Sequence, residues 1–364
     1  MPQRKVRSTK YEDSLCSYFR LRTFSGLRKQ GGFSLPELLV AVTILLIISS
    51  AVTSGLLQVT SSQKTIWNRT QLHAGVRSAT ELLQQEVGQA GRIALPGTAS
   101  LASAVGIGTH TVAVNQVING ATVASVSGMF PNQRLTIDAG TDADTTTHQE
   151  TVVVTAVDTN AKTITATFEY THPTAAPVMA LGGFATGIVP DKKWTGAAWA
   201  TYPNGSDGTH LKLYGDINGD GSMVYVEYFC DTAAGNLYRN IMAYDAAPPK
   251  PAVTSSMVLL GNILPNPGAT PCFTYMPSPL PYLTGVTDAY CACAQVFVLD
   301  VAITLTVQTQ LKDPITNQFQ TETKALLNVS PRNVFNVWQL ASAGGTVYQG
   351  RVQPMPATVS ALLP

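Results

Sequence analysis

The chain has 364 residues, of which 45% are hydrophobic and 12% charged, and its formal net charge is +1. This near-neutral balance hides two unlike parts. Residues 1–32 carry eight Lys or Arg and two acidic residues, which leaves 15 basic and 20 acidic residues in the rest of the chain. Nucleic acid binds to basic surfaces because its phosphates are negative, so an acidic remainder excludes it as an expected partner.

Residues 1–32 form a basic leader directly before an apolar stretch, residues 38–59. Positive charge stays on the cytoplasmic side of a membrane, which predicts a cytoplasmic N-terminus. As a helix the stretch reaches roughly 33 Å, enough for a hydrocarbon core of about 30 Å. An ordinary secretory signal has its small-residue cleavage site after the apolar run, whereas Gly31 and Gly32 lie before it. A cut there keeps the helix as an N-terminal anchor in the inner membrane.

Glu37 lies at the entry of this apolar stretch. A carboxylate in lipid costs roughly 2.5 to 3.5 kcal/mol on insertion scales, so Glu37 calls for a partner. Cleavage before Phe33 creates an α-amino group four residues away, and the helix dipole favours a carboxylate in the first turn. The other candidate partner is an amine on another subunit.

The junction resembles the class III signal of type IV prepilins and type II secretion pseudopilins, whose usual form is Gly, Phe, Thr, Leu, Ile, Glu. Here it reads Gly32, Phe33, Ser34, Leu35, Pro36, Glu37. The resemblance implies that a membrane peptidase cuts after Gly32 and methylates Phe33. It also implies that Glu37 sets subunit register in a helical filament. Pro36 departs from the usual Ile, but proline is tolerated in the first turn of a helix. An uncleaved signal anchor is the alternative.

Beyond the membrane stretch, apolar residues recur at steps of three or four, the spacing of one helical face. They are Leu72, Val76, Ala79, Leu83, Val87, Ala90 and Ala94. One helix is therefore expected over residues 33–94, ended by Leu95, Pro96 and Gly97. The remaining arc is polar and is expected to face away from the core; its residues are Arg69, Gln71, Glu81, Gln84, Gln85 and Glu86.

The rest of the chain predicts β structure, so the fold class is α+β with a mostly antiparallel head. Residues 98–183 resemble small all-β modules inserted in bacterial and phage surface proteins, and we interpret them as a display insertion. Residues 184–350 are the expected pilin-like head. Its clearest strand has apolar residues at every second position from Phe297 to Val307, followed by turn residues 312–317 and a partner strand over 321–329. Residues 351–364 are expected to be a frayed tail.

Two further segments resemble particular subtypes of the family. Residues 85–91 resemble the helix end of W-type minor pilins and of J-type type II secretion pseudopilins. Residues 330–333 resemble the tail of W-type minor pilins.

A twelve-residue calcium-loop pattern starts at Asp216 and continues through Asn218, Asp220 and Gly221 to Glu227. Alternate oxygen ligands, a glycine for the tight turn and a late glutamate suit a hard cation such as calcium, the one candidate cofactor. No helix follows, however, and a straight strand would carry Glu227 away from the loop. Asp216, Asn218 and Asp220 are therefore the preferred ligands. The alternative is a hairpin turn in which Asp216 and Asp220 cap backbone groups.

After the loss of Cys16 with the leader, four cysteines remain on the extracytoplasmic side, where disulfides are favoured. They are Cys230, Cys272, Cys291 and Cys293. Cys291 and Cys293 are two residues apart on an expected strand and more naturally bond elsewhere than to each other. A zinc site made of all four thiolates is the alternative, although the paired spacing of a zinc ribbon is missing.

Enzyme signatures are not found: the five histidines form no His-Glu-x-x-His pair, and no nucleophile elbow or phosphate loop is present. The leading interpretation is a structural minor pilin or pseudopilin, with prepilin peptidase and other pilins as partners and a final place in a periplasmic or cell-surface filament. A second is an adhesin mounted on a pilin stalk, for which Trp194, Trp199 and Tyr202 form either a binding loop or a core turn. A third is a membrane-anchored periplasmic protein that never polymerises.

Overall fold

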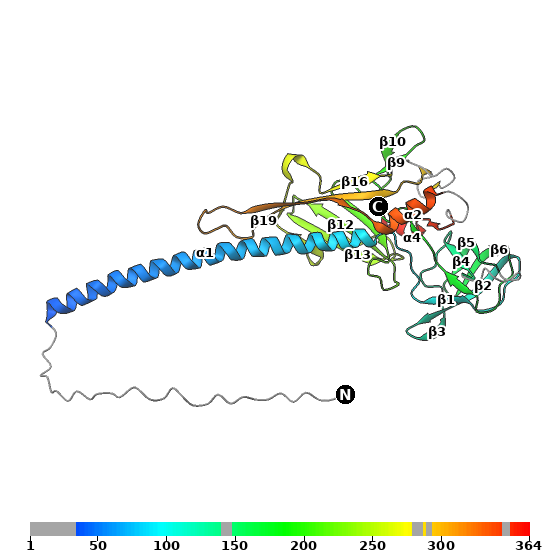
Figure 1. The fold of residues 1–364 in the computed structure, drawn as a ribbon, viewed down its shortest axis with the longest axis horizontal. Helices are drawn as coiled ribbons and strands as arrows, with labels where there is room; N and C mark the ends of the chain where they lie inside the picture. Colours follow the sequence, from blue (N-terminus) through cyan, green and yellow to red (C-terminus); the bar gives the residue numbers. More distant parts are fainter. Residues whose placement is uncertain (1–33, 140–147, 279–286, 289–292, 344–349) are drawn as a thin grey trace, which may run out of the picture. The chain divides into compact units, whose positions relative to one another are not determined.

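The computed structural model describes residues 34–139, 148–278, 287–288, 293–343 and 350–364 (Figure 1). The chain divides into two compact units, Met1–Val59 and Thr60–Pro364. Helix α1, Leu35–Gln89, begins in the first and ends in the second. Everything after α1 is built mainly from antiparallel strands, which confirms the predicted α+β class.

The first β region is a closed six-strand barrel. Its strands pair in the order β1-β7-β4-β5-β6-β2, and β1 also pairs with β2, which closes the ring; β3 extends β2 on the outside. The strands are β1 (Thr98–Leu101), β2 (Gly108–Ile118), β3 (Ala121–Ala124), β4 (Arg134–Ile137), β5 (Glu150–Asp158), β6 (Thr163–Phe168) and β7 (Pro177–Met179). Alternate side chains point inward and form a core of their own, as the period of two along these strands requires.

The head contains the remaining strands. They are β8 (Gly183–Phe184), β9 (Lys192–Trp194), β10 (Trp199–Thr201), β11 (His210–Gly215), β12 (Val224–Asp231), β13 (Asn236–Ala243), β14 (Val258–Gly261), β15 (Ile263–Leu264), β16 (Phe273–Pro277), β17 (Thr287–Asp288), β18 (Cys293–Ala294), β19 (Val298–Gln308), β20 (Thr321–Val329) and β21 (Val352–Gln353). One sheet has the order β11-β12-β13-β14, and a second has β19 between β20 on one side and β15 and β16 on the other. Strands β9, β10, β17 and β18 form a third sheet, and β8 pairs with β21 in parallel. Short 3-10 helices occupy Ser255–Met257 and Pro267–Ala269.

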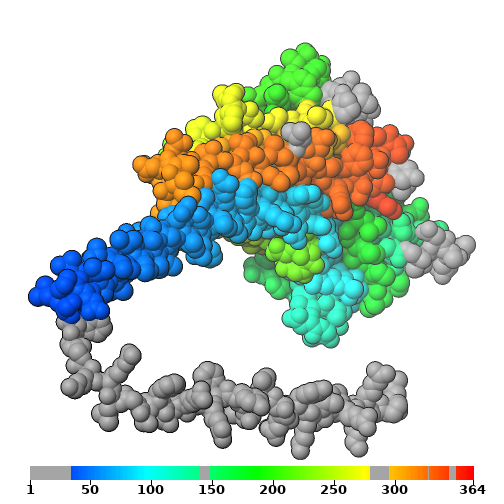
Figure 2. Space-filling model, turned by 60° about the vertical axis from the view of Figure 1, so that its left-hand side comes forward, coloured from blue at the N-terminus to red at the C-terminus, as the bar shows by residue number. Residues whose placement is uncertain are grey.

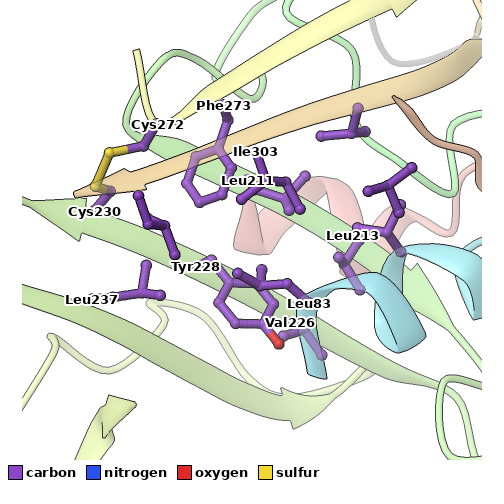
Figure 3. Close-up of a cluster of buried hydrophobic side chains, with 14 of the residues drawn as sticks. Leu83, Leu211, Leu213, Val226, Tyr228, Cys230, Leu237, Cys272, Phe273 and Ile303 are labelled. Carbon is purple, nitrogen blue, oxygen red and sulfur yellow. A yellow bond between two sulfur atoms is a disulfide. The ribbon is translucent and has the colours of Figure 1, made fainter. Parts of the chain in front are cut away.

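The second half of α1 packs its apolar face against these sheets. Leu72, Val76, Leu83, Val87 and Ala90 are buried in the largest core cluster, as their spacing predicts. Figure 3 shows Leu83 directed at Val226, Leu211 and Leu213 of the first head sheet. The predicted hairpin is also present, as β19 and β20.

Glu86 is an exception to the predicted polar arc. Its side chain is only 5% exposed, and it lies between Tyr228 of β12 and Arg239 of β13. The Tyr228 hydroxyl donates to Glu86 Oε2 at 2.5 Å, and Arg239 Nε lies 3.1 and 3.2 Å from the two carboxylate oxygens. Burial, followed by the nearby carboxylate, raises the pKa of Tyr228 well above its ordinary value. The helix is thus attached to the sheet by a buried, charge-assisted contact as well as by apolar packing.

The helix ends at Gln89, earlier than the predicted end at residue 94, because Gly91 leaves the helical conformation at φ +80. Its N–H donates to the Tyr214 carbonyl at 2.9 Å, and its carbonyl accepts from Phe184 N–H at 2.8 Å. A Cβ on Gly187 would lie 2.1 Å from the Gly91 Cα. The backbones approach too closely here for a further helical turn.

Two helices were not predicted. Helix α2, Arg332–Ser342, buries Val334, Val337 and Ala341 on one face. Helix α4, Ala357–Leu362, lies in the tail that was expected to fray, and that expectation is wrong: Val359, Leu362 and Leu363 are fully buried. Their burial partners include Phe184 and Tyr214, which are distant in the sequence, so local composition does not reveal the contact.

A disulfide joins Cys230 of β12 to Cys272, which lies just before β16 (Figure 3). It connects the two main sheets of the head beneath the α1 packing surface. Cys291 lies outside the described residues, and so does the side chain of Cys293. Their pairing stays a prediction.

Loss of the disulfide should destabilise the head strongly. The two cysteines are 42 residues apart, and closing a loop of that length stabilises the fold by about 4 kcal/mol in the chain-entropy account. Replacing Cys230 and Cys272 together by Ser should lower the melting temperature of the detergent-solubilised chain, followed by circular dichroism. Reductant should lower it in the wild type and leave the double variant unchanged. Equal melting of the oxidised wild type and the variant would contradict the bond.

Glu86→Ala should cost about 3 kcal/mol, because it leaves the largely buried Arg239 guanidinium, whose side chain is 22% exposed, without its partner. Glu81 provides a matched control on the same helix: it pairs with Arg77, but both side chains are more than half exposed. Glu81→Ala should therefore change stability by less than about 1 kcal/mol. Urea unfolding of the two variants in parallel measures the difference, and similar costs for both would show that the Glu86 contact contributes little.

Candidate functional site

The N-terminal end of α1 is the site to which the sequence points most directly. The helix begins at Leu35, and the N–H groups of Glu37 and Leu38 both donate to the Ser34 carbonyl, at 2.9 and 3.1 Å. Pro36 lies within this first turn, where its missing N–H leaves no helical hydrogen bond unmade. Gly32 and Phe33 lie outside the described residues.

Glu37 is exposed at the start of the helix. It is the only charged residue between Leu35 and Gln63, and no described residue forms an ion pair with it. A carboxylate in the first turn interacts favourably with the positive end of the helix dipole. That interaction is available to a single copy of the chain, whereas full neutralisation of the charge requires a cation from beyond the described residues.

The first half of α1 is apolar on every side. From Leu38 to Val59 the large apolar side chains are between 45% and 66% exposed, and they include Leu39, Ile44, Leu46, Ile48, Val52 and Leu57. Within the described part of the chain, α1 is the helix that is long and apolar enough to cross a membrane. A helix without a polar face requires an apolar environment all around it, either lipid or other helices.

Two of the predicted calcium ligands, Asp216 and Asp220, have partners within the chain. Asp216 is fully buried, with its Oδ1 accepting from Gly221 N–H at 3.3 Å and its Oδ2 lying 3.4 Å from Arg92 Nε. Asp220 Oδ1 accepts from Ser222 N–H at 2.8 Å, as in the alternative capping interpretation. Arg92 thus brings a cation next to the Asp216 carboxylate.

Glu227 is also misplaced for that site. It lies in β12 opposite Lys212 of β11, three residues inside a strand that starts at Val224, or about 10 Å from the loop end. In the described part of the chain, no group of three or more His, Cys, Asp or Glu side chains could hold a metal ion. Glu227 therefore lies away from the other three predicted ligands, and calcium binding by Asp216, Asn218 and Asp220 stays a sequence-based prediction.

Glu227 instead belongs to a buried cluster around the end of the chain. Its Oε2 accepts from the Tyr225 hydroxyl at 2.8 Å and from Lys250 Nζ at 2.6 Å. Lys212 Nζ donates to the Leu363 carbonyl at 2.6 Å, and Lys250 Nζ donates to it at 3.3 Å. Two lysines thus hold the last residues of the chain against β11 and β12.

Comparison with known families matches one segment of the chain. A family described as the prokaryotic N-terminal methylation motif matches residues 27–53. The chain carries the type IV pilin signature. No curated protein and no solved structure matches the chain.

The motif covers the end of the leader, the proposed cleavage point and most of the apolar half of α1. It supports a type IV pilin-like subunit that prepilin peptidase processes and N-methylates. It points to a structural protein and not to an enzyme, and to assembly with other pilin subunits in general. With the apolar helix, it indicates anchoring in a membrane and a later place in a surface filament.

One buried set in the barrel was missed by sequence reasoning. His172 is fully buried between two carboxylates. Its Nδ1 lies 2.5 Å from Asp138 Oδ2 and its Nε2 lies 2.5 Å from Glu150 Oε1. The three residues are far apart in the sequence and meet because the barrel closes, so no local pattern signals them.

The aromatic residues near residue 200 divide between two roles. Tyr202 is buried in the core, as in the core-turn interpretation. Trp194 and Trp199 face each other across the β9–β10 hairpin with ring centroids 5.4 Å apart, and Trp199 is 40% exposed. Of the three aromatic residues, Trp194 and Trp199 are therefore the two that solvent reaches.

The cluster of Lys212, Lys250 and Glu227 predicts that the free energy of unfolding rises with pH. Burial first, and then Lys250, lowers the pKa of Lys212 from 10.5 to about 8, although Glu227 opposes the shift. Between these values the unfolded chain holds a proton that the folded chain has lost, so the free energy of unfolding should increase from pH 8 towards pH 10. Lys212→Met should remove this increase, whereas Lys192→Met, at an exposed position, should retain it. Urea unfolding across this pH range is the measurement, and equal slopes for the two variants would contradict the assignment.

Proposed function

We propose that the protein is a minor pilin or pseudopilin, a structural subunit that joins a type IV pilus or a type II secretion pseudopilus through the first half of α1. Prepilin peptidase removes residues 1–32 by cutting after Gly32 and methylates the new Phe33 amine. The subunit then waits in the inner membrane until it is transferred into the filament. The observation that carries this proposal is the methylation motif directly ahead of a helix that is apolar on all sides and has one exposed carboxylate at its start.

Assembly exchanges lipid for sister helices around the same surface. Lipid tails are as apolar as leucine, so helix association in a membrane depends on close packing and on polar contacts rather than on the hydrophobic effect. Ala51 and Gly55 are four residues apart on α1, and a Cβ built on Gly55 meets nothing within 4 Å. Small residues at this spacing allow two helix backbones to approach closely.

Glu37 supplies the polar contact of this assembly. In the proposed filament its carboxylate pairs with the methylated amine of Phe33 on a neighbouring subunit. The pairing removes the cost of an isolated charge in an apolar environment from both subunits at once, and it does so at one axial position. Register along the filament therefore follows from a single ion pair.

A second role, display of the barrel as a binding module on the filament, is supported by the core of that barrel. Its buried residues form a cluster separate from those of the head. Loops of a closed barrel can vary without disturbing the core that supports them. This role is compatible with the first, since the same subunit can both assemble and bind.

Glu37→Ala should leave removal of the leader unchanged and reduce incorporation into filaments, because the peptidase cuts at Gly32 whereas the carboxylate acts later. Mass spectrometry of the N-terminus and immunoblotting of sheared filaments measure the two steps separately. Gly32→Val is the complementary control and should block cleavage. Wild-type incorporation of the Glu37 variant would exclude the register role, and an intact leader in the wild-type protein would favour a non-polymerising membrane protein.

A further inference from the structure

The hairpin β19–β20 lies along α1, and its connecting segment, residues 309–320, is called the tip. Figure 1 and Figure 2 show the hairpin lying beside the helix. His73 Nδ1 lies 2.6 Å from Glu322 Oε2. Arg69 Nε donates to Gln320 Oε1 at 2.7 Å, and the Thr65 hydroxyl donates to Asp313 Oδ1 at 2.9 Å. These contacts move towards the start of α1 as the tip is approached.

Successive contacts are separated by equal distances along α1 and along the hairpin. Four helical residues, from His73 to Arg69, and two strand residues, from Glu322 to Gln320, each cover about 6 Å. The middle of the tip is therefore expected at the level of Thr65 or closer to the start of the helix. Thr65 follows Val59, the last apolar residue of the predicted span, by six residues. As a helix these six residues cover about 9 Å, slightly more than the roughly 5 to 7 Å that the headgroup layer adds on one side of a bilayer, so the outer edge of that layer is expected within a few Å of Thr65.

Asp313 holds the tip in a defined shape. It is 3% exposed and accepts from Ile315 N–H at 2.8 Å and from Gln320 Nε2 at 2.5 Å, in addition to Thr65. Its own N–H donates to the Gln318 carbonyl at 2.9 Å. The accepted hydrogen bonds, that of Ile315 first, keep the pKa of Asp313 below its ordinary value. The side chains beyond Asp313 are thus presented by an ordered loop.

This ordered loop exposes large apolar side chains. Leu311 and Ile315 are each 65% exposed and Phe319 is 42% exposed, within a segment of nine residues. Lys312 Nζ lies 5.6 Å from the centre of the Phe319 ring, so one cation accompanies them. On α1 at the same level, Ile66 is 64% and Trp67 70% exposed.

This combination matches the requirements of a lipid surface. Trp and Phe are favoured at membrane interfaces, where an apolar ring meets polar headgroups. A lysine extends its ammonium towards lipid phosphates while its stem stays on apolar surface, and each such charge near an anionic leaflet contributes about 1 kcal/mol. Leu311, Ile315 and Phe319 are large apolar side chains held close together on an ordered loop, and exposed apolar groups gathered in this way mark a contact surface.

We propose that the tip rests on the outer face of the inner membrane, with Ile315 reaching the headgroups, Leu311 and Phe319 facing them and Lys312 on a lipid phosphate, before the subunit enters a filament. The contact fixes the head against the bilayer at a second point besides α1. It rests on the membrane anchoring in the proposed function and does not depend on assembly. Release of the tip then becomes part of the work of extracting the subunit.

The test uses the mature full chain in vesicles of phosphatidylethanolamine and phosphatidylglycerol whose acyl chains carry bromine near the headgroup. In a Trp67→Phe background, Ile315→Trp adds a fluorophore at the tip. Lys324→Trp adds one at an exposed position in β20, further from the membrane. The added emission at position 315 should be quenched several-fold more than that at position 324. Equal quenching at the two positions overturns the proposal.

A second measurement on the wild-type chain guards against misfolding of these variants. Lys312 and Lys324 are both exposed, so a water-soluble acylating reagent should label Lys312 several-fold more slowly than Lys324 in the vesicles. Equal labelling of chains that float with the vesicles overturns the membrane contact and leaves the pilin proposal intact. Failure of the chain to float would instead contradict the membrane anchoring on which both depend.

Discussion

The buried attachment of α1 to the head is the interaction on which the rest of the structure depends. One continuous helix has to satisfy two different environments: its first half is apolar on every side, whereas its second half has an apolar face and a polar one. The second half can act as a support for the head only if it cannot slide or rotate. Apolar packing alone tolerates small sliding movements, but the ion pair of Glu86 with Arg239 fixes one axial and rotational position.

The same requirement explains the dense backbone packing where α1 ends. Gly91 turns the chain out of the helix, and Gly187 and Gly215 allow the backbones of the head to approach within contact distance. Gln353 then joins the tail to the barrel: its amide group is fully buried and bonds to both the N–H and the carbonyl of Arg134. Helix, barrel and tail therefore meet in one region, and the barrel is attached to the head by hydrogen bonds as well as by the chain that connects them.

Features that depend on local pattern were predictable from the sequence. The spacing of Leu72, Val76 and Leu83 defined the buried helix face, and the period of two along residues 297–307 defined the central strand. The junction at Gly32 and Glu37 defined the class of protein, in agreement with the methylation motif.

Features that depend on distant partners were not predictable. Glu86 has the local surroundings of a surface residue, and only the arrival of Arg239 from β13 explains its burial. At Asp216, the first residue of the calcium pattern, the fold brings in the guanidinium of Arg92, which the pattern itself does not indicate. The tail and His172 acquire their partners in the same way, through strands that are far away in the sequence.

Two glutamates of the same helix differ in whether the chain itself supplies a cation for the carboxylate. Glu86 is buried and has its cation within the chain, so its charge stabilises a single subunit. Glu37 lies in an apolar segment, and within the described residues it has no cation. A carboxylate in such surroundings lowers its free energy whenever a positive group is brought to it, and the magnitude, a few kcal/mol, is large compared with single helix–helix contacts in lipid. In the proposed filament that positive group is the amine at the start of a neighbouring copy of the same helix, and the chain's own Phe33 amine is the alternative partner. A partner on the neighbouring copy makes the gain depend on the register of two helices, whereas the chain's own amine does not.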